Sequence, residues 1–367
     1  MDFGFSEEQN MLRDQVNRFM KERCPMDQVR QILKSDNKLD SALWSEISNL
    51  GWLALTIPEQ YGGLGLGWVD LTVVLEETAA GLCPLPVASH SLAAKAVLLC
   101  GSEEQKAKWL PPISEGSSVS TLGLFDDPNW ISAEGISCSA SETDTGFSLS
   151  GCKPFVSDAT LCDWLFLAFN FEDQLVLAKI EREQCEIQSE PTMDETKPMG
   201  RVTLDSVSVD KSDTMTLSNE HLTTLTNYGA LAVTAEMVGA AQSLLDLTSE
   251  YAKDRIQFGK PIGQYQGVKH RLAEMFVDIE SFRSLCYYAA WALDDAPSEV
   301  DRAVSLAKGY ASDAFAEIGI DGVGLHGAIG FTAEYDAQLY LKRSKWARPM
   351  YGDSNYHLDR LATLGGL

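Results

Sequence analysis

Residues 251–275 read YAKDRIQFGKPIGQYQGVKHRLAEM, and this stretch decides how the C-terminal part of the chain is expected to fold. Its centre, FGKP at 258–261, interrupts two segments of helical spacing, because glycine suits the end of one helix and proline the start of the next. The stretch carries five Lys or Arg against two acidic residues, in a chain of 367 residues with a formal net charge of −24. A local excess of cations at a helix boundary indicates a site for an anionic ligand.

The remaining composition argues against several classes of function. A net charge of −24 disfavours general affinity for nucleic acids and for anionic membranes. The eight cysteines form no CxxC pair and no zinc-type spacing with histidine, so we expect reduced thiols, a cytoplasmic protein and no metal site. The N-terminus lacks the basic and apolar regions of a signal peptide, and no run of about 18 apolar residues predicts a membrane span.

Hydrophobic spacing divides the chain into three parts and predicts an α+β multidomain fold. Residues 1–117 have helical spacing, residues 118–222 show short alternating runs rich in Ser, Thr and Val, and residues 223–367 are helical again. We therefore expect an N-terminal helical domain, a central β-barrel-like domain and a C-terminal four-helix bundle. The four bundle helices are expected at 224–254, 264–294, 298–325 and 334–348.

Four short motifs link this order of domains to a known family. They are PEQYGGLGL at 58–66, GSEEQK at 101–106 before Leu110-Pro111, RIQFGKPI at 255–262 before Gln266, and LHGAIGFT at 325–332 before Glu334. In this order they resemble the motifs of the acyl-CoA dehydrogenase family over essentially the whole chain. The turn at 351–353, Tyr-Gly-Asp, is similar to the branch of that family that acts on bulky, steroid-derived CoA thioesters, in which paired subunits occur.

The resemblance implies an FAD site and gives the basic stretch a role in it. Arg255 matches the arginine that meets the FAD pyrophosphate. Gln257 and Phe258 match its neighbours at the flavin nucleotide, and Gln266 matches the glutamine that opens the next helix. A forked guanidinium and the N–H groups of a helix start suit a pyrophosphate. In the family this half of FAD reaches a neighbouring subunit, which implies a tetramer. Taken alone, the basic stretch is equally consistent with a solvated helix.

A glycine-rich turn is the second segment that the resemblance places at FAD. It supplies Gly324, His326, Gly327 and Ala328, where backbone N–H groups can approach a phosphate without a Cβ in the way. Two positions depart from the family pattern, since Gly324 replaces a glutamine and Ala328 replaces a glycine. A backbone contact survives both changes, whereas a side-chain amide contact does not. Helix ends use glycine too, so this turn by itself is a weak signal.

The third segment is GCKPFVSD at 151–158, which resembles the family's GxKxWITN strand. Phe155 then stands where an aromatic ring covers the flavin, and Ser157 keeps a hydroxyl for the flavin edge. The competing interpretation is an ordinary strand with an outward serine. The preceding loop, DDPNW at 126–130, lacks the Gly-Ser-Asp end of the family's TEPxxGSD loop. In the family that loop touches both the flavin and the pantetheine arm of the substrate.

The reaction implied by the family is α,β-dehydrogenation of an acyl-CoA thioester, which needs a carboxylate base. In the YEGT-like turn before the last helix the glutamate is absent, and Asp353 is the nearest acid. The alternative position, on the first bundle helix, holds Gly229. Glu236 lies about two turns further along that helix. Asp353 is therefore the candidate base, with a helix N-cap as the competing or additional role.

Three functions are expected from this pattern. The first is an FAD-dependent acyl-CoA dehydrogenase that passes electrons to an electron-transfer flavoprotein, as a homotetramer. The second is a non-catalytic subunit that lends Arg255, Gln257 and Gln266 to the flavin of a catalytic chain in an α2β2 heterotetramer. The third is a flavin oxidase or monooxygenase on the same fold. Acyl-CoA is the expected substrate of the first two, and neither nucleic acid nor membrane is an expected partner.

Overall fold

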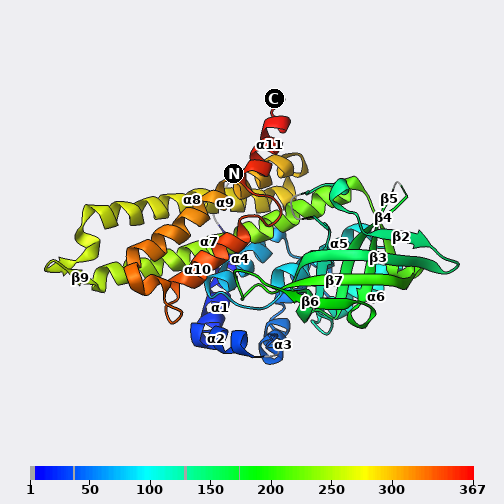
Figure 1. Ribbon diagram of the computed structural model, residues 1–367, viewed down its shortest axis with the longest axis horizontal. Coiled ribbons are helices and arrows are strands. Elements are labelled where there is room, and N and C mark those ends of the chain that lie inside the picture. Colours follow the sequence, from blue (N-terminus) through cyan, green and yellow to red (C-terminus); the bar gives the residue numbers. More distant parts are fainter. Residues whose placement is uncertain (1–4, 36–37, 128–129, 173) are drawn as a thin grey trace. The chain divides into compact units, whose positions relative to one another are not determined.

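The computed structural model describes residues 5–35, 38–127, 130–172 and 174–367 (Figure 1). The chain divides into two compact units. The first unit comprises Met1–Gln31, Trp68–Cys83 and Ala230–Leu367, and the second comprises Ile32–Gly67 and Pro84–Gly229. Helices precede the sheet along the chain and follow it, so the predicted α+β order of helices, strands and helices is confirmed. The domain boundaries at residues 117 and 222 stay a prediction.

The helices lie where the hydrophobic spacing predicts them. The helices before the sheet are α1 (Glu7–Arg23), α2 (Met26–Lys34), α3 (Ser41–Asn49), α4 (Trp68–Ala80), α5 (Val87–Cys100) and α6 (Glu103–Ser114). Those after it are α7 (Asn219–Asp254), α8 (Gln266–Asp295), α9 (Val300–His326), α10 (Ala337–Ala347) and α11 (Ser354–Leu364). Capping boxes at Ser6 and Ser102 start α1 and α6, because each serine accepts a bond from the glutamine three residues on.

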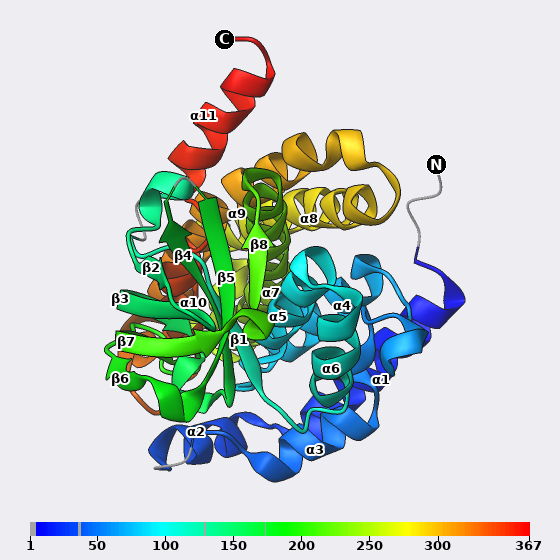
Figure 2. The same cartoon turned by 90° about the vertical axis from the view of Figure 1, so that its right-hand side faces the viewer.

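The second unit is organised around one mixed sheet (Figure 2). Its strands are β1 (Ser120–Gly123), β2 (Ser139–Glu142), β3 (Gly146–Ser157), β4 (Trp164–Phe171), β5 (Gln174–Glu181), β6 (Glu186–Glu190), β7 (Met199–Asp210) and β8 (Thr214–Leu217). They pair in the order β6-β7-β3-β2-β4-β5-β8, and β1 pairs in parallel with β4. Apolar side chains such as Leu149, Leu167 and Val202 form the buried core of this sheet.

A buried histidine joins α5 to this sheet. The Ser120 N–H donates to His90 Nδ1 at 3.1 Å, and His90 Nε2 lies 2.8 Å from the Ile113 carbonyl oxygen. The ring therefore accepts at Nδ1 and donates at Nε2, which is the pattern of a neutral imidazole. Burial lowers the pKa of His90 to about 4. His90 thus connects α5, the end of α6 and the start of β1 without carrying a charge.

The first unit packs α8, α10 and α11 against α9, and α4 against α1 and α8. Helix α7 crosses α4 at close range, because a Cβ on Gly239 would lie 1.8 Å from the Glu76 carbonyl oxygen. Among the described residues, α7 is the one helix long and apolar enough to cross a membrane. Buried positions make up 78% of its most apolar window, as expected for a core helix.

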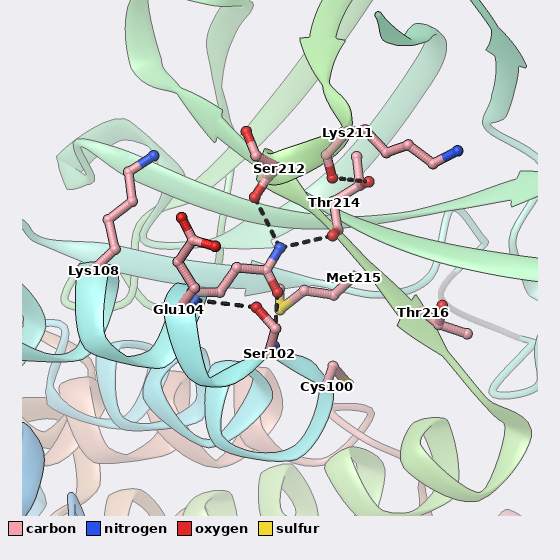
Figure 3. Close-up of a pocket in the computed structure, with 11 residues that line it drawn as sticks. Cys100, Ser102, Glu104, Lys108, Lys211, Ser212, Thr214, Met215 and Thr216 are labelled. Atoms are coloured by element: carbon pink, nitrogen blue, oxygen red, sulfur yellow. Dashed lines mark hydrogen bonds between the residues drawn. The ribbon is translucent and has the colours of Figure 1, made fainter.

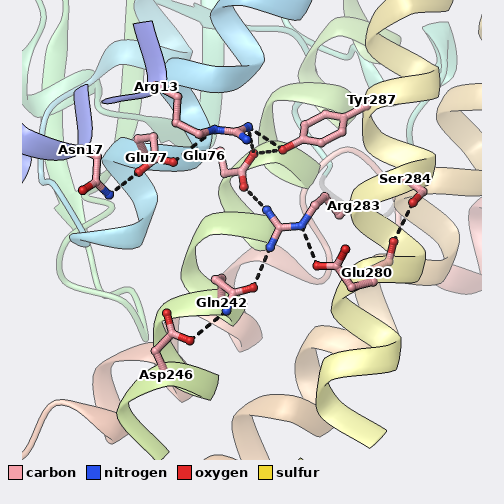
Figure 4. A network of polar contacts seen from close by, with 10 residues as sticks. All are labelled: Arg13, Asn17, Glu76, Glu77, Gln242, Asp246, Glu280, Arg283, Ser284 and Tyr287. Atoms are coloured by element: carbon pink, nitrogen blue, oxygen red, sulfur yellow. Dashed lines mark hydrogen bonds and ion pairs between the residues drawn. The ribbon is translucent and has the colours of Figure 1, made fainter. Parts of the chain in front are cut away.

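A buried carboxylate on α4, Glu76, gathers donors from two other helices of this unit (Figure 4). Arg283 on α8 pairs with Glu76 Oε1, while Arg13 on α1 lies 3.2 Å from Oε2. The Tyr287 hydroxyl also donates to Oε2. Burial, followed by the charge of Glu76, raises the pKa of Tyr287, so the phenol keeps the proton that it donates. The Glu76 side chain is only 5% exposed.

The same two arginines extend the contact to neighbouring polar groups. Arg283 Nη2 donates to Gln242 Oε1 on α7 at 2.7 Å, and Arg283 Nε lies 3.1 Å from Glu280 Oε1. Arg13 Nε lies 3.5 Å from Glu77 Oε1. Because a buried charge needs partners on every side, this network holds α1, α4, α7 and α8 in one arrangement.

Removing the charge of Glu76 tests this network. Glu76→Gln keeps the side-chain size but leaves two guanidinium groups without their shared counterion, so the free energy of unfolding should fall by about 3–5 kcal/mol. Denaturant unfolding measures the loss. Glu280→Gln is the matched control, because it removes a partner of Arg283 that is 47% exposed and should cost less than about 1 kcal/mol. Equal losses in the two variants would contradict the central role of Glu76.

His90 makes stability depend on pH in a defined window. The folded pKa of about 4 lies below the ordinary value of 6.5. Between these values the unfolded chain binds a proton that the folded chain does not, so stability falls as the pH drops from 6.5 to 4, by up to roughly 3 kcal/mol. When the free energy of unfolding is measured at several pH values in this range and plotted against pH, His90→Gln should show a shallower slope than the wild type. A His270→Gln control, at an exposed position, should keep the wild-type slope. The same pH dependence in His90→Gln and wild type would rule out this titration.

Candidate functional site

The basic stretch forms a β-hairpin at the junction of α7 and α8. Strand β9 (Ile256–Gln257) pairs antiparallel with β10 (Lys260–Pro261). The two residues between them, Phe258 and Gly259, have φ values of 52° and 84°. A two-residue turn with both φ values positive is the type I′ turn that suits the twist of a hairpin. The break between the two helices was predicted from the sequence, whereas the hairpin that fills it was not.

The hairpin presents its predicted site residues to solvent. Arg255 and Gln257 are exposed, and the Phe258 ring is 94% exposed. The base of the hairpin is fixed by Tyr265, whose hydroxyl donates to the Gln257 carbonyl oxygen at 2.9 Å. Figure 1 shows the hairpin at the end of the α7–α8 pair. The guanidinium and the aromatic tip are therefore available to a ligand or to another chain.

Helix α8 begins at Gln266, directly after the hairpin. Its N-cap residue, Tyr265, makes no side-chain capping bond, and Gln266 is exposed. The N–H groups at the start of a helix have no intrahelical partners and carry partial positive charge. With Arg255 and Lys260 on the adjoining hairpin, this helix start can attract an anionic group such as a pyrophosphate.

The glycine-rich turn lies where α9 ends. Gly327 has φ 64° and ψ −142°, a conformation that a residue with a Cβ rarely adopts. A Cβ at Gly324 or at Gly327 would meet no atom within 4 Å, so a ligand can reach the backbone at both positions. Ala328 is exposed as well. The Gly327 N–H already donates to the Gly324 carbonyl oxygen, so a phosphate contact at this turn stays a prediction, and Gly324 has no side-chain amide to supply one.

His326 differs from the other residues of this turn, because its side chain is buried. His326 Nδ1 lies 2.6 Å from the Gly322 carbonyl oxygen, and the ring packs on Tyr251 and Tyr335 with centroids 4.5 Å and 4.9 Å away. Burial lowers the pKa of His326, so the imidazole stays neutral. The buried imidazole packs on the inner side of the turn, and the backbone beside it, at Gly327 and Ala328, remains exposed.

Tyr251 brings the hairpin and the glycine-rich turn together, and sequence reasoning missed it. Its hydroxyl donates to the His326 carbonyl oxygen at 3.3 Å, and its own carbonyl oxygen accepts from the Arg255 N–H at 2.8 Å. The second bond is the ordinary helical bond at the end of α7, whereas the first joins the last turn of α7 to the end of α9, just before Gly327. Tyr251 is the first residue of the basic stretch, and its aromatic ring is the signal that could have identified this contact.

The strand segment predicted to touch the flavin belongs to the second unit. Phe155 lies at a β-bulge of β3, has φ 54° and is 43% exposed. The bulge turns its ring outward while Lys153 is fully buried and pairs with Asp126. The Ser157 carbonyl oxygen accepts from Thr121 Oγ1 at 2.6 Å. In the loop at 126–130, Pro128 and Asn129 lie outside the described residues.

The last turn of the chain precedes α11 and contains the candidate base. Asp353 is the N-cap of α11, and its Oδ1 accepts the Tyr356 N–H at 3.0 Å, so the capping role is observed. The residues before it, Tyr351 and Gly352, have φ values of 55° and 100°. If Gly352 is matched to the glycine of the YEGT-like turn, Tyr351 takes the place of the glutamate. Gly229 and Glu236 are both buried on α7.

A hollow of about 490 Å³ in the second unit contains none of the predicted residues (Figure 3). Gln105 Nε2 donates to the Ser212 and Thr214 carbonyl oxygens at 2.8 Å, which fixes one wall. Cys100 Sγ lies 3.5 Å from His221 Nδ1, but burial raises the pKa of Cys100 to about 12 and keeps the thiol protonated. This hollow therefore offers no activated nucleophile.

Comparisons with known proteins agree with the motifs. The model of the acyl-CoA dehydrogenase N-terminal domain matches residues 6–117, and that of the C-terminal domain matches residues 221–364. The chain is 31% identical over 358 residues to acyl-CoA dehydrogenase IpdE2 of Mycolicibacterium smegmatis, covering 97% of this chain and 98% of that protein. It is 27% identical over 373 residues to glutaryl-CoA dehydrogenase of Desulfococcus multivorans, covering 97% and 95%. A solved structure of a variant of the Tcur3481–Tcur3483 steroid ACAD has a TM-score of 0.88 and 27% identity, with 98% of each chain covered.

Proposed function

Since this chain belongs to the acyl-CoA dehydrogenase family, we propose that it carries out the α,β-dehydrogenation of an acyl-CoA thioester and passes the electrons to an electron-transfer flavoprotein. Members of this family are oxidoreductases that act on the CH–CH bond of acyl-CoA, and the cofactor is FAD. When bound, FAD accepts the β-hydrogen as a hydride. The protein must then bind the pyrophosphate, orient the thioester and remove the α-proton.

One observation supports the FAD site most strongly. The Tyr251 hydroxyl donates to the His326 carbonyl oxygen, and Arg255 follows one turn later at the end of α7, so a forked cation and the glycine-rich turn lie in the same part of one unit. Both are groups that bind pyrophosphate well. Gln257, Phe258 and Gln266 extend this surface along the exposed hairpin and the start of α8. Phe155 and Ser157, on β3 of the second unit, stay proposed flavin contacts on the strength of the sequence motif alone.

The exposed hairpin further supports an assembly of several chains. An aromatic ring that is 94% exposed beside Ile256, which is 61% exposed, gains stability when another surface covers it. We propose that this hairpin tip packs against a neighbouring subunit and that Arg255 contacts the FAD of that subunit. Either a homotetramer or an α2β2 heterotetramer satisfies this geometry.

Asp353 is the residue that we assign as the base. It is the acid of the last turn, and its cap bond engages Oδ1, so Oδ2 of the carboxylate can accept the α-proton. A bulky, ring-bearing acyl group is the proposed substrate class, in keeping with the steroid ACAD among the similar structures.

The observed cap favours a second candidate function. A carboxylate that only caps α11 would leave this chain without a base, since Tyr351 and Gly229 occupy the positions where the family places one. The chain would then be the FAD-supporting subunit of a heteromer. A similar structure, the Tcur3481–Tcur3483 steroid ACAD, is named for two gene products, in keeping with this function. Arg255 would act in both cases, whereas Asp353 would act only in the first.

FAD retention should depend on Arg255. Arg255→Ala deprives the pyrophosphate of a charge-assisted partner worth roughly 1.5–3 kcal/mol, so FAD should bind at least tenfold more weakly. The flavin-to-protein ratio of the purified assembly, read from its absorption spectrum, measures the effect. Arg271→Ala, an exposed arginine of α8 that pairs with Glu274 and Asp321, should retain FAD. Full flavin content in Arg255→Ala would refute the assignment.

Asp353 separates the two candidate functions. Asp353→Asn should keep FAD but lose about 10²–10⁴ in the rate at which acyl-CoA bleaches the flavin anaerobically, because an amide cannot accept the α-proton. Stability should hardly change, since Asn caps a helix about as well as Asp, whereas Asp353→Ala should cost about 1 kcal/mol. The assay uses the assembled protein with any partner chain co-expressed. An unchanged bleaching rate in Asp353→Asn would favour the supporting-subunit function.

A further inference from the structure

Lys308, on α9, is a fully buried lysine that the proposed reaction does not yet use. Its Nζ donates to Ser312 Oγ at 2.7 Å, to the Arg348 carbonyl oxygen at 2.9 Å and to the Gly352 carbonyl oxygen at 2.7 Å. A lysine ammonium has three protons and no acceptor, so each proton has one partner. Two of these partners are backbone groups at the two ends of the turn before Asp353.

The turn from Arg348 to Asp353 has an unusual backbone conformation that its surroundings must stabilise. Tyr351 has φ 55°, a left-handed conformation that a residue with a side chain keeps only where the surroundings enforce it. A Cβ on Gly352, at φ 100°, would lie 2.3 Å from Tyr356 Cδ1, so α11 packs directly on the turn. His357 Nε2 lies 3.1 Å from the Tyr351 carbonyl oxygen. Lys308 and His357 thus fix three carbonyl groups of the turn, at Arg348, Tyr351 and Gly352.

Burial and nearby charged groups also affect the pKa of Lys308. Burial lowers the pKa of Lys308 to about 7, while Asp353 and then Asp313 act in the opposite direction and Arg348 adds to the lowering. Burial, with Lys308 as the next cause, lowers the pKa of His357 to about 3, so that imidazole is neutral. Asp353 on the N-cap of α11 and Asp313 on α9 are therefore the anions that face this ammonium. A methionine would fill the same space without the cost of burying a charge.

We propose that Lys308 is a positioning residue for Asp353, because its bonds to the Arg348 and Gly352 carbonyl oxygens tie the two ends of the turn before Asp353 together. The inference rests on the proposed function, in which Asp353 removes the α-proton. Lys308 acts through the backbone of the turn, and in this way it determines where the Asp353 carboxylate lies.

Lys308→Met in the assembled, FAD-loaded protein tests the proposal. Backbone amides of residues 350–357 should exchange hydrogen at least about tenfold faster, because the turn has lost two of its anchors. The limiting rate of flavin bleaching at saturating acyl-CoA should fall at least about tenfold, while the acyl-CoA concentration that gives half of that rate stays the same, because the base is displaced and the substrate site is not. FAD content should stay unchanged. If Lys308→Met does not assemble, Lys308→Gln removes the same charge and keeps a donor.

Tyr310→Phe is the control on the same helix. It removes the hydrogen bond to Asp278 on α8 and leaves the bonds of Lys308 to Arg348 and Gly352 in place, so exchange and bleaching rate should match the wild type. An unchanged limiting bleaching rate in the Lys308 variants, or exchange equal to that of Tyr310→Phe, overturns the proposal. If Asp353→Asn bleaches at the wild-type rate, the assigned base is at fault and the proposed function fails first.

Discussion

A single buried carboxylate determines the arrangement of the first unit. Glu76 lies on an apolar helix, where an uncompensated charge would be too costly, so its two oxygens must find donors inside the protein. Arg13, Arg283 and Tyr287 supply them from two helices that are distant in sequence. Helices α7, α8 and α9 pack in the same unit, and they carry the hairpin and the glycine-rich turn.

Backbone strain occurs in several of the segments that carry proposed site residues. Seven non-glycine residues in the described part of the chain have positive φ: Phe155 and Asp158 lie in the strand segment, Phe258 lies at the hairpin tip and Tyr351 lies in the turn before α11, while Leu82, Glu172 and Ser206 lie elsewhere. Such conformations persist only where the surroundings enforce them. A β-bulge, a type I′ turn and a buried ammonium provide that enforcement at three separate points.

Two cations in different environments are proposed to have different roles in this acidic chain. The protein is strongly acidic, yet the groups that we propose to bind FAD and to position the candidate base are cations, Arg255 beside the exposed hairpin and Lys308 in the interior. The exposed cation is open to solvent. The buried cation acts only on its own chain, because its three protons are all engaged there.

The sequence by itself determined the order of helices and strands, the family and the identity of the cofactor, because hydrophobic period and motif spacing are local properties of the chain. It also located the basic stretch at 251–275 and Asp353 with its two competing roles. Only the tertiary structure decided that the stretch forms a hairpin, that His326 points inward and that Tyr251 and Lys308 link distant segments. The Tyr251–His326 and Lys308–Gly352 contacts join residues that are 75 and 44 positions apart, and no local pattern encodes which donor meets which carbonyl group.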